Sequence, residues 1–313
     1  MQEITWSRFR GCLLGSAVGD ALGMPVEGAR ASSIRQRLGE VRDFLPAPWR
    51  NLRAGQWTDD TKMMLCHARS IARKGAVDPE DIADELLGWM DSGDWRGMGN
   101  ATYSSLKRLR QGASPLESGE VGETAAGSGG AMRIAPVALF RCWDLEALRR
   151  DVETSCRITH RNPEAVAGSL AVAYVVARAA VGELDPSRLL QEVASFIGPC
   201  AVGEKLALAG RFLEKGTDDT EALLRLGTSG HVAETVASAF FCFLRHLDDL
   251  EGSLVAAVSG GQDAGTTAAV TGAMSGAWLG EEAIPARWLQ GLEGAGEIRA
   301  LADVIHDLVF PPR

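Results

Sequence analysis

The sequence predicts an all-α protein. Apolar and small residues recur at spacings of three and four along the whole 313-residue chain, as they do on the buried faces of helices. Alternating runs rich in Val, Ile and Thr, which are typical of strands, are almost absent. Glycine is abundant, with 36 residues, and small side chains let packed helices approach closely. The chain is therefore expected to form a single compact helical domain over residues 1–313.

The first helix is predicted from Trp6 onward, because Phe9, Leu13, Ala17 and Leu22 follow the helical spacing. Further helices are predicted over residues 61–74, 81–90, 132–141, 145–157, 164–180, 187–197, 205–215, 233–247, 267–279 and 298–309.

A capping side chain followed by proline marks two of these helix starts, at Asn162-Pro163 and Asp185-Pro186. The Gly and Pro clusters between helices are short, and none has the length of a flexible interdomain linker.

Composition argues against several partners. The net charge of −9 provides no general attraction to nucleic acid or to anionic membranes, so neither is an expected partner. The N-terminus lacks the features of a secretory signal, and no apolar stretch is long enough to span a bilayer. The six cysteines show no paired spacing and are expected to be buried free thiols. We therefore expect a soluble, cytoplasmic monomer.

The sharpest local signal is the run Thr58-Asp59-Asp60-Thr61, just before an amphipathic helix. A helix N-cap is one interpretation, since acidic residues are common in first helical turns. Capping needs only one such side chain, however, whereas several hard oxygen ligands packed together are what Mg²⁺ or Ca²⁺ requires. Taken alone, the run leaves both interpretations open.

Two glycine-rich turns also precede helices. One delivers Asp263 and Thr266 to the start of a small-residue helix, where they can bind a metal or simply cap the helix. The other covers residues 126–133, and its backbone N–H groups suit a phosphate or diphosphate. It matches neither a Walker loop nor a dinucleotide-binding fingerprint.

In their order along the chain, these segments resemble the ADP-ribosylglycohydrolase family, and the resemblance covers nearly the whole chain. It is carried by RGCLLGSAVGDALG at residues 10–23, PVE at 25–27, WTDDT at 57–61, GAMRIAP at 130–136, TH at 159–160, SGHVAET at 229–235 and TTAAVTGAMSG at 266–276. The family implies an orthogonal all-α bundle, a cleft for two Mg²⁺ ions, and hydrolysis of the bond between ADP-ribose and a protein side chain, with arginine the expected acceptor. ADP-ribose or an ADP-ribosylated protein is then the expected partner.

The resemblance also implies roles for particular residues. The family's metal-ligand positions fall on Thr58, Asp59, Asp60, Asp263 and Thr266. Three carboxylates converging in a cleft would repel one another unless divalent cations neutralised them, so this arrangement is physically reasonable.

Catalytic and substrate-binding residues follow in the same way. Glu27 resembles a glutamate that acts as a gate or acid/base group beside the metals, and Asp59 and Asp60 are the other expected catalytic residues. The segment expected to hold the diphosphate and distal ribose comprises Gly127, Ser128, Gly129, Gly130 and Met132, while His160 is expected near the phosphates and His231 near the adenine.

This chain departs from the family pattern at two carboxylates and at one aromatic residue. Gly265 stands where a second aspartate of the C-terminal metal motif is usual, and Gly97 stands where many bacterial members have aspartate. His231 replaces a tyrosine that often stacks on adenine. With one ligand missing, we expect one well-bound Mg²⁺ and a weakened second site. The sequence thus favours a slow hydrolase, with a catalytically impaired ADP-ribose-binding protein as the alternative.

Overall fold

Helices form almost all of the regular structure in the computed structural model, which describes residues 2–311 and side chains from Thr5 onward. Within this range no sheet is present, and extended segments pair only through isolated bridges. The all-α prediction is therefore confirmed.

The α-helices are α1 (Gln2–Gly23), α2 (Ala31–Leu38), α3 (Asp59–Lys74), α4 (Pro79–Asp91), α5 (Asn100–Arg110), α6 (Pro115–Ser118), α7 (Ala135–Phe140), α8 (Leu145–Arg157), α9 (Pro163–Ala180), α10 (Leu189–Ile197), α11 (Ala201–Glu214), α12 (Asp219–Leu226), α13 (Val232–Arg245), α14 (Leu250–Ser259), α15 (Ala264–Leu279), α16 (Ala286–Gly291) and α17 (Ala295–Val309). Short 3₁₀ turns are η1 (Met24–Val26), η2 (Pro48–Arg50), η3 (Glu123–Ala125), η4 (Ser128–Gly130) and η5 (Glu281–Ala283).

Each helix predicted from the sequence is present, although most begin or end a few residues away from the expected positions. Asn162 caps α9 through the N–H groups of Glu164 and Ala165, as predicted. The prediction of a cap at Asp185 is wrong, because its carboxylate binds Ser187 within a turn and α10 begins only at Leu189. The sequence does not predict α2, α5, α6, α12, α14 and α16, which are short or have little apolar patterning.

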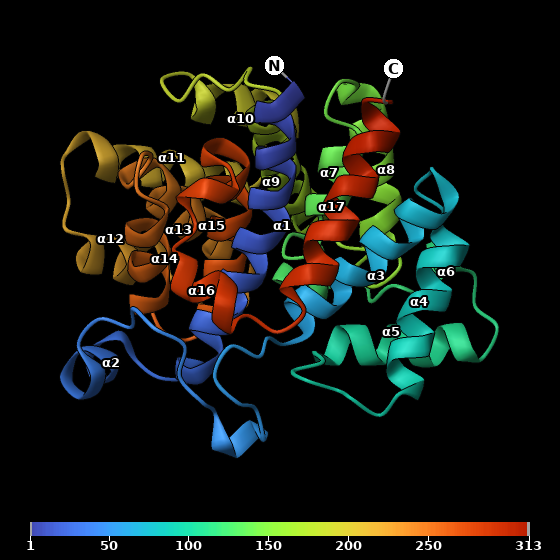
Figure 1. Ribbon diagram of the computed structural model, residues 1–313, viewed down its shortest axis with the longest axis horizontal. Helices are drawn as coiled ribbons and strands as arrows, with labels where there is room; N and C mark the ends of the chain where they lie inside the picture. Colours follow the sequence, from blue (N-terminus) through green and yellow to red (C-terminus); the bar gives the residue numbers. More distant parts are fainter. Residues whose placement is uncertain (1, 312–313) are drawn as a thin grey trace.

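The centre of the molecule is the antiparallel pair α1 and α15, which lie side by side in Figure 1. Their backbones are in direct contact along a stripe of small residues. A Cβ atom added to Gly15 would lie 2.3 Å from the carbonyl oxygen of Gly272, and one added to Gly19 would lie 2.1 Å from that of Ala268. Side chains larger than hydrogen at these glycines therefore prevent the approach.

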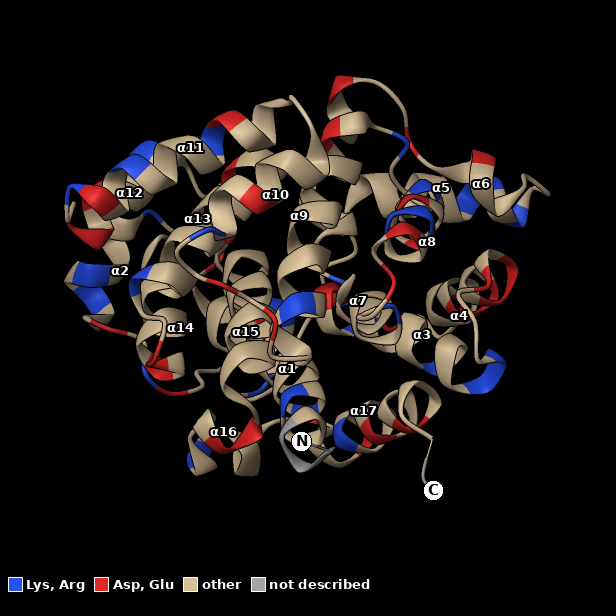
Figure 2. Ribbon diagram, turned by 90° about the horizontal axis from the view of Figure 1, so that it is seen from above, with Lys and Arg blue, Asp and Glu red and all other residues tan. Residues whose placement is uncertain are grey.

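The other helices surround this pair. The buried apolar cluster includes residues from Phe9 in α1 to Ile305 in α17. Charged residues lie mainly on the outer helices, as Figure 2 shows for α2, α4, α11 and α12. All six cysteines are free as predicted, and Cys200 alone among them is partly exposed. No helix within residues 2–311 is long and apolar enough to cross a membrane.

The close helix contact gives a stability prediction. Gly272→Ala should lower the free energy of unfolding by about 2 kcal/mol or more, because the added methyl overlaps the α1 backbone. Gly296→Ala in α17 is the matched control: its added methyl meets no atom within 4 Å, and alanine is favoured over glycine inside a helix by roughly 0.5–1 kcal/mol. Denaturant unfolding of both variants measures the difference. Equal stability of the two would contradict the packing account.

Candidate functional site

A buried carboxylate organises the start of α3. Asp20 of α1 is fully buried and accepts the hydroxyl protons of Thr58 (2.8 Å) and Thr61 (2.7 Å). It also accepts the N–H groups of the same two threonines, each at 3.0 Å. Thr58 makes no side-chain capping bond to α3. The threonines of this run therefore hold the turn in place, which leaves the two aspartates between them for another use.

Asp59 and Asp60 join Glu27 and Asp263 along one cavity of about 320 Å³. Burial and the charge of Asp20 raise the pKa values of Asp59 and Asp60 well above their usual range. Burial also raises the pKa of Asp263, and it raises that of Glu27 to about 8 despite the opposing charge of Arg50. Such mutual destabilisation of buried carboxylates indicates a site that gains from a cation.

The two walls of this acidic cluster are hydrogen-bonded to each other through the backbone. Gly28 N–H donates to the Gln262 carbonyl, and Gln262 N–H donates to the Ala29 carbonyl, each at 2.8 Å. The segment after α1 is thus tied to the segment before α15. This pairing places Glu27 opposite Asp263, whose Oδ1 accepts the Thr266 hydroxyl proton at 2.8 Å.

The predicted glycine loop lines the same cavity and touches the acidic cluster, because the Ser128 hydroxyl donates to Asp263 Oδ2 at 3.4 Å. Gly127, Ser128, Gly129 and Met132 line it together with His160. Ser128 N–H donates to the Gly230 carbonyl (3.0 Å), which fixes the loop beside the start of α13. A Cβ atom on Gly129 would lie 2.5 Å from the His160 ring, so glycine is needed for this close approach.

His160 is neutral at physiological pH. Burial, and then the charge of Arg133, lowers its pKa to about 3. Its Nδ1 is 2.7 Å from the Thr159 hydroxyl, and its ring lines the cavity beside Gly127 and Gly129. A neutral imidazole in this position can exchange hydrogen bonds with a polar ligand without adding a charge.

The two glycines that replace expected aspartates are each covered by a carboxylate. A Cβ atom on Gly265 would lie 2.0 Å from Glu27 Oε1, and one on Gly97 would lie 2.5 Å from Asp59 Oδ1. Gly97 also has a positive φ of 76°, which side chains rarely adopt. Other acids of this chain thus occupy the space that an aspartate at either position would need.

Three predicted site residues do not line the cavity. Thr58 is buried behind it, with its hydroxyl directed to Asp20. Gly130 is buried against Ser169 and Cys156. His231 is exposed, and its Nδ1 accepts the Ala233 N–H (3.3 Å) at the start of α13.

Sequence reasoning assigned no role to Asp20 or to Arg50. Asp20 is a lone carboxylate among the buried positions of α1, and that isolation is a signal of a structural or functional role. Arg50 lies in the 3₁₀ turn η2, and its Nη2 is 2.6 Å from Glu27 Oε2. No local motif marks it, because its partner lies 23 residues earlier.

The donor set is suited to Mg²⁺. Asp60 is 3% exposed, and its Oδ1 is buried without a hydrogen-bond partner among the described residues. No three His, Cys, Asp or Glu side chains within the described part converge closely enough, as they stand, to hold an ion. Mg²⁺ is commonly held by one or two carboxylates and retains several waters, so the pair Asp59 and Asp60 with Asp263 opposite is sufficient.

Comparisons with known proteins identify the family. A model of the ADP-ribosylglycohydrolase family matches residues 1–312. The ADP-ribosyl-[dinitrogen reductase] glycohydrolase of Rhodospirillum rubrum is 31% identical over 289 residues, which cover 91% of this chain and 90% of that protein. The ADP-ribosylarginine hydrolase Tri1 of Serratia proteamaculans is 29% identical over 301 residues, which cover 94% of this chain and 77% of that protein.

A solved structure shares the fold. It is described as an ADP-ribosylglycohydrolase-related protein complex and matches with a TM-score of 0.82 and 31% identity, over 98% of this chain and 99% of that chain. The helical bundle with its acidic cleft is thus that of a glycohydrolase. The chain belongs to the ADP-ribosylglycohydrolase family and is an enzyme that hydrolyses ADP-ribose linkages.

The raised pKa values predict how stability depends on pH in metal-free protein. The folded chain keeps a proton on Glu27 up to about pH 8, whereas the unfolded chain releases it near pH 4.5. The unfolded state therefore binds fewer protons in this window, and stability should fall as pH rises from about 5 to 8. Asp59 and Asp60 act in the same direction. Melting temperatures measured in EDTA test this, and Glu27→Gln should make the fall shallower. A melting temperature that rises over this range would count against the buried acidic cluster.

Proposed function

We propose that this chain is a Mg²⁺-dependent hydrolase that releases ADP-ribose from modified protein side chains. The observation that carries the proposal is one cavity that is lined by both the acidic cluster and the glycine loop. Backbone N–H groups of such a loop suit a diphosphate, and the acids suit a hard cation beside the ribose.

Each wall of the cavity has a part in the proposed reaction. Ser128, Gly129 and His160 bind the diphosphate end, and Asp59, Asp60 and Asp263 hold the metal. A bound Mg²⁺ would orient the ribose hydroxyls and polarise the glycosidic bond. Glu27 lines the cavity beside these acids, so it is placed to exchange a proton with the departing side chain.

Two ions of unequal affinity are part of the proposal. Asp59 and Asp60 supply the stronger site, and Gly265 leaves the second site without one of the family's carboxylates. The Glu27 carboxylate over Gly265 also accepts the N–H of that residue. To bind a second ion there, the Glu27 carboxylate would have to give up its hydrogen bond from the Gly265 N–H.

For the acceptor, the relative from Serratia proteamaculans supports arginine, since it is named as an ADP-ribosylarginine hydrolase. The relative from Rhodospirillum rubrum supports a protein substrate, because its name specifies an ADP-ribosylated reductase. The alternative, an impaired binding protein, predicts ADP-ribose binding without release from either kind of acceptor.

The double variant Asp59→Asn/Asp60→Asn tests the metal assignment. It should slow release of ADP-ribose by at least about a hundredfold and weaken Mg²⁺ by more than tenfold, because both charged ligands are lost. Chelation with EDTA should stop release from the parent. Release is measured on ADP-ribosylated protein, and Mg²⁺ affinity by calorimetry.

The control variant Asp84→Asn/Asp248→Asn removes the same two charges from exposed positions and should leave both quantities unchanged. If the Asp59/Asp60 variant bound Mg²⁺ as tightly as the control, these residues would not be the metal ligands.

A further inference from the structure

An apolar cavity lies beside the acidic cluster, on the segment between α1 and α3 that forms the lower edge of the molecule in Figure 1. It has a volume of about 350 Å³, and its wall is mostly apolar, including Pro25, Ala29, Leu38, Leu45, Pro46 and Trp49. Glu27 lines this cavity and also the cavity that contains the acidic cluster. The two cavities therefore adjoin at Glu27.

Trp49 lies at the tip of a turn that is closed by hydrogen bonds. The N–H of Ala47 donates to the Leu52 carbonyl at 2.9 Å, and the N–H of Leu52 donates to the Ala47 carbonyl at 3.2 Å. Ala47 and Leu52 are buried together with Met24 of η1, so the turn is anchored to the bundle. Trp49 is 66% exposed, the highest exposure of an aromatic ring among the described residues. A tryptophan held outward on an ordered turn is typical of a protein interface.

The same segment has an excess of positive charge. Residues 24–58 include six arginines and three acids, whereas the whole chain has a net charge of −9. Arg42 pairs with Glu40 and Glu251, and Arg50 pairs with Glu27. The other four arginines are exposed, and their side chains have no ion-pair or hydrogen-bond partner among the described residues; they are Arg30, Arg35, Arg37 and Arg53. Figure 2 shows part of this positive charge on α2.

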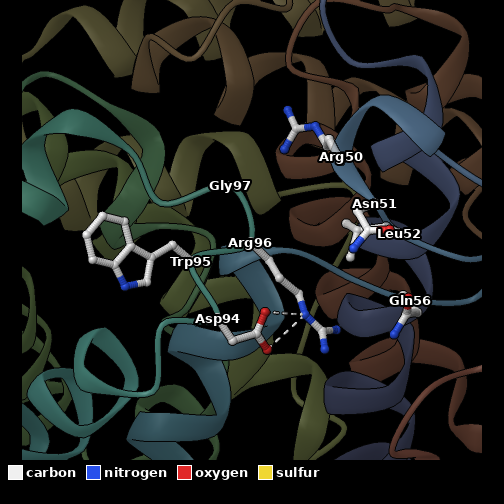
Figure 3. Close-up of a pocket in the computed structure, with 8 residues that line it drawn as sticks. All are labelled: Arg50, Asn51, Leu52, Gln56, Asp94, Trp95, Arg96 and Gly97. Atoms are coloured by element: carbon white, nitrogen blue, oxygen red, sulfur yellow. Dashed lines mark hydrogen bonds and ion pairs between the residues drawn. The ribbon is translucent and has the colours of Figure 1, made fainter.

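The arginines of a neighbouring cavity are paired instead. That cavity has a volume of about 550 Å³ and is lined by Gln56 and residues 50–52 and 94–97 (Figure 3). Arg96 Nε donates to both oxygens of Asp94 at 3.0 Å, and Arg50 Nη2 is 2.6 Å from Glu27 Oε2. By contrast, Arg37 lines the apolar cavity and is unpaired within the described part of the chain. The apolar cavity thus combines exposed apolar surface with positive charge that a partner can neutralise.

This surface is within reach of the protein that carries ADP-ribose, if the proposed function holds. The bond to be hydrolysed then lies at the acidic cluster, so the residues on either side of the modified one lie at the molecular surface next to it. Since the apolar cavity adjoins the cluster at Glu27, these flanking residues can contact it.

We propose that the apolar cavity, Trp49 and the unpaired arginines form a docking surface for the protein part of the substrate. The protein that fits presents an apolar side chain and acidic residues next to its modified residue. The apolar side chain enters the cavity against Trp49, and both are removed from water. The acidic residues face the unpaired arginines. The negative charge of the rest of the chain directs such a partner to this surface.

The test uses ADP-ribosylated arginine in three forms: free, in a peptide with phenylalanine and acidic residues on both sides, and in a matched peptide with serine and amides in their place. The parent should cleave the first peptide with a kcat/KM at least about tenfold higher than the matched one, through a lower KM. Trp49→Ala should bring this ratio to within about threefold of one. Arg30→Gln/Arg37→Gln should lower it by about threefold or more, and added salt should do the same in the parent.

The control variants remove the same groups elsewhere. Trp143→Ala removes a tryptophan that is 56% exposed, and Arg150→Gln/Arg211→Gln removes two exposed charges from α8 and α11. Both should keep the parent ratio. All four variants should cleave free ADP-ribosylated arginine like the parent, because none of the changed residues lines the cavity of the acidic cluster.

The outcomes separate this inference from the proposed function. Equal kcat/KM for the two peptides, or a ratio that either Trp49→Ala or the double arginine variant leaves unchanged, would overturn the docking surface, while cleavage of the free form keeps the hydrolase proposal. Cleavage of none of the three forms would overturn the hydrolase proposal, and the ratio of the two peptide dissociation constants in parent and variants then decides the docking surface. Self-association of the chain that Trp49→Ala abolishes would assign the surface to a second copy and overturn the inference.

Discussion

The site depends on the backbone contact between α1 and α15. Gly15, Gly19 and Gly23 of α1 leave no space between their Cα atoms and the carbonyl groups of α15. This contact brings the end of α1 next to the start of α15. Asp20 lies in α1, Glu27 follows it, and Asp263 directly precedes α15. The packing of the two helices therefore sets the distance between acids that are some 240 positions apart in the sequence.

Asp20 extends this constraint to α3. A fully buried carboxylate is unfavourable unless it is hydrogen-bonded, and four donors from Thr58 and Thr61 satisfy it. Asp59 and Asp60 are then held on the cavity side of the turn, where burial and neighbouring charge raise their pKa values. The fold thus holds together carboxylates that would repel one another when ionised, and a bound cation would relieve this repulsion, as in the metal site that we propose.

The sequence alone predicts the all-α class and most of the long helices. These helices can be predicted because the spacing of apolar and small residues within each segment is typical of a helix. Helix α8 was predicted at both ends, whereas the polar helix α5 was missed because two of its four buried residues, Thr102 and Ser105, are polar. The glycine loop and the acids were found as motifs and do line one cavity.

Contacts between residues that are far apart in the chain could not be predicted from the sequence. Nothing in the local pattern shows that Arg50 pairs with Glu27, or that the carboxylates of Glu27 and Asp59 cover Gly265 and Gly97. The sequence alone shows those two glycines only as lost carboxylates. In the structure they are also the positions that allow Glu27 and Asp59 to approach, which is a packing fact that a single sequence does not contain.

The central claim is that one cavity holds the metal at Asp59 and Asp60 and the diphosphate at residues 127–129. A crystal structure of the protein with Mn²⁺ and ADP-ribose tests it most directly, since anomalous scattering locates the ion independently of the nucleotide. The account predicts a strong anomalous peak between the Asp59/Asp60 pair and Asp263, a weaker or absent second peak near Gly265, and the diphosphate against the N–H group of Gly129. An ion bound elsewhere, or ADP-ribose outside this cavity, would contradict it.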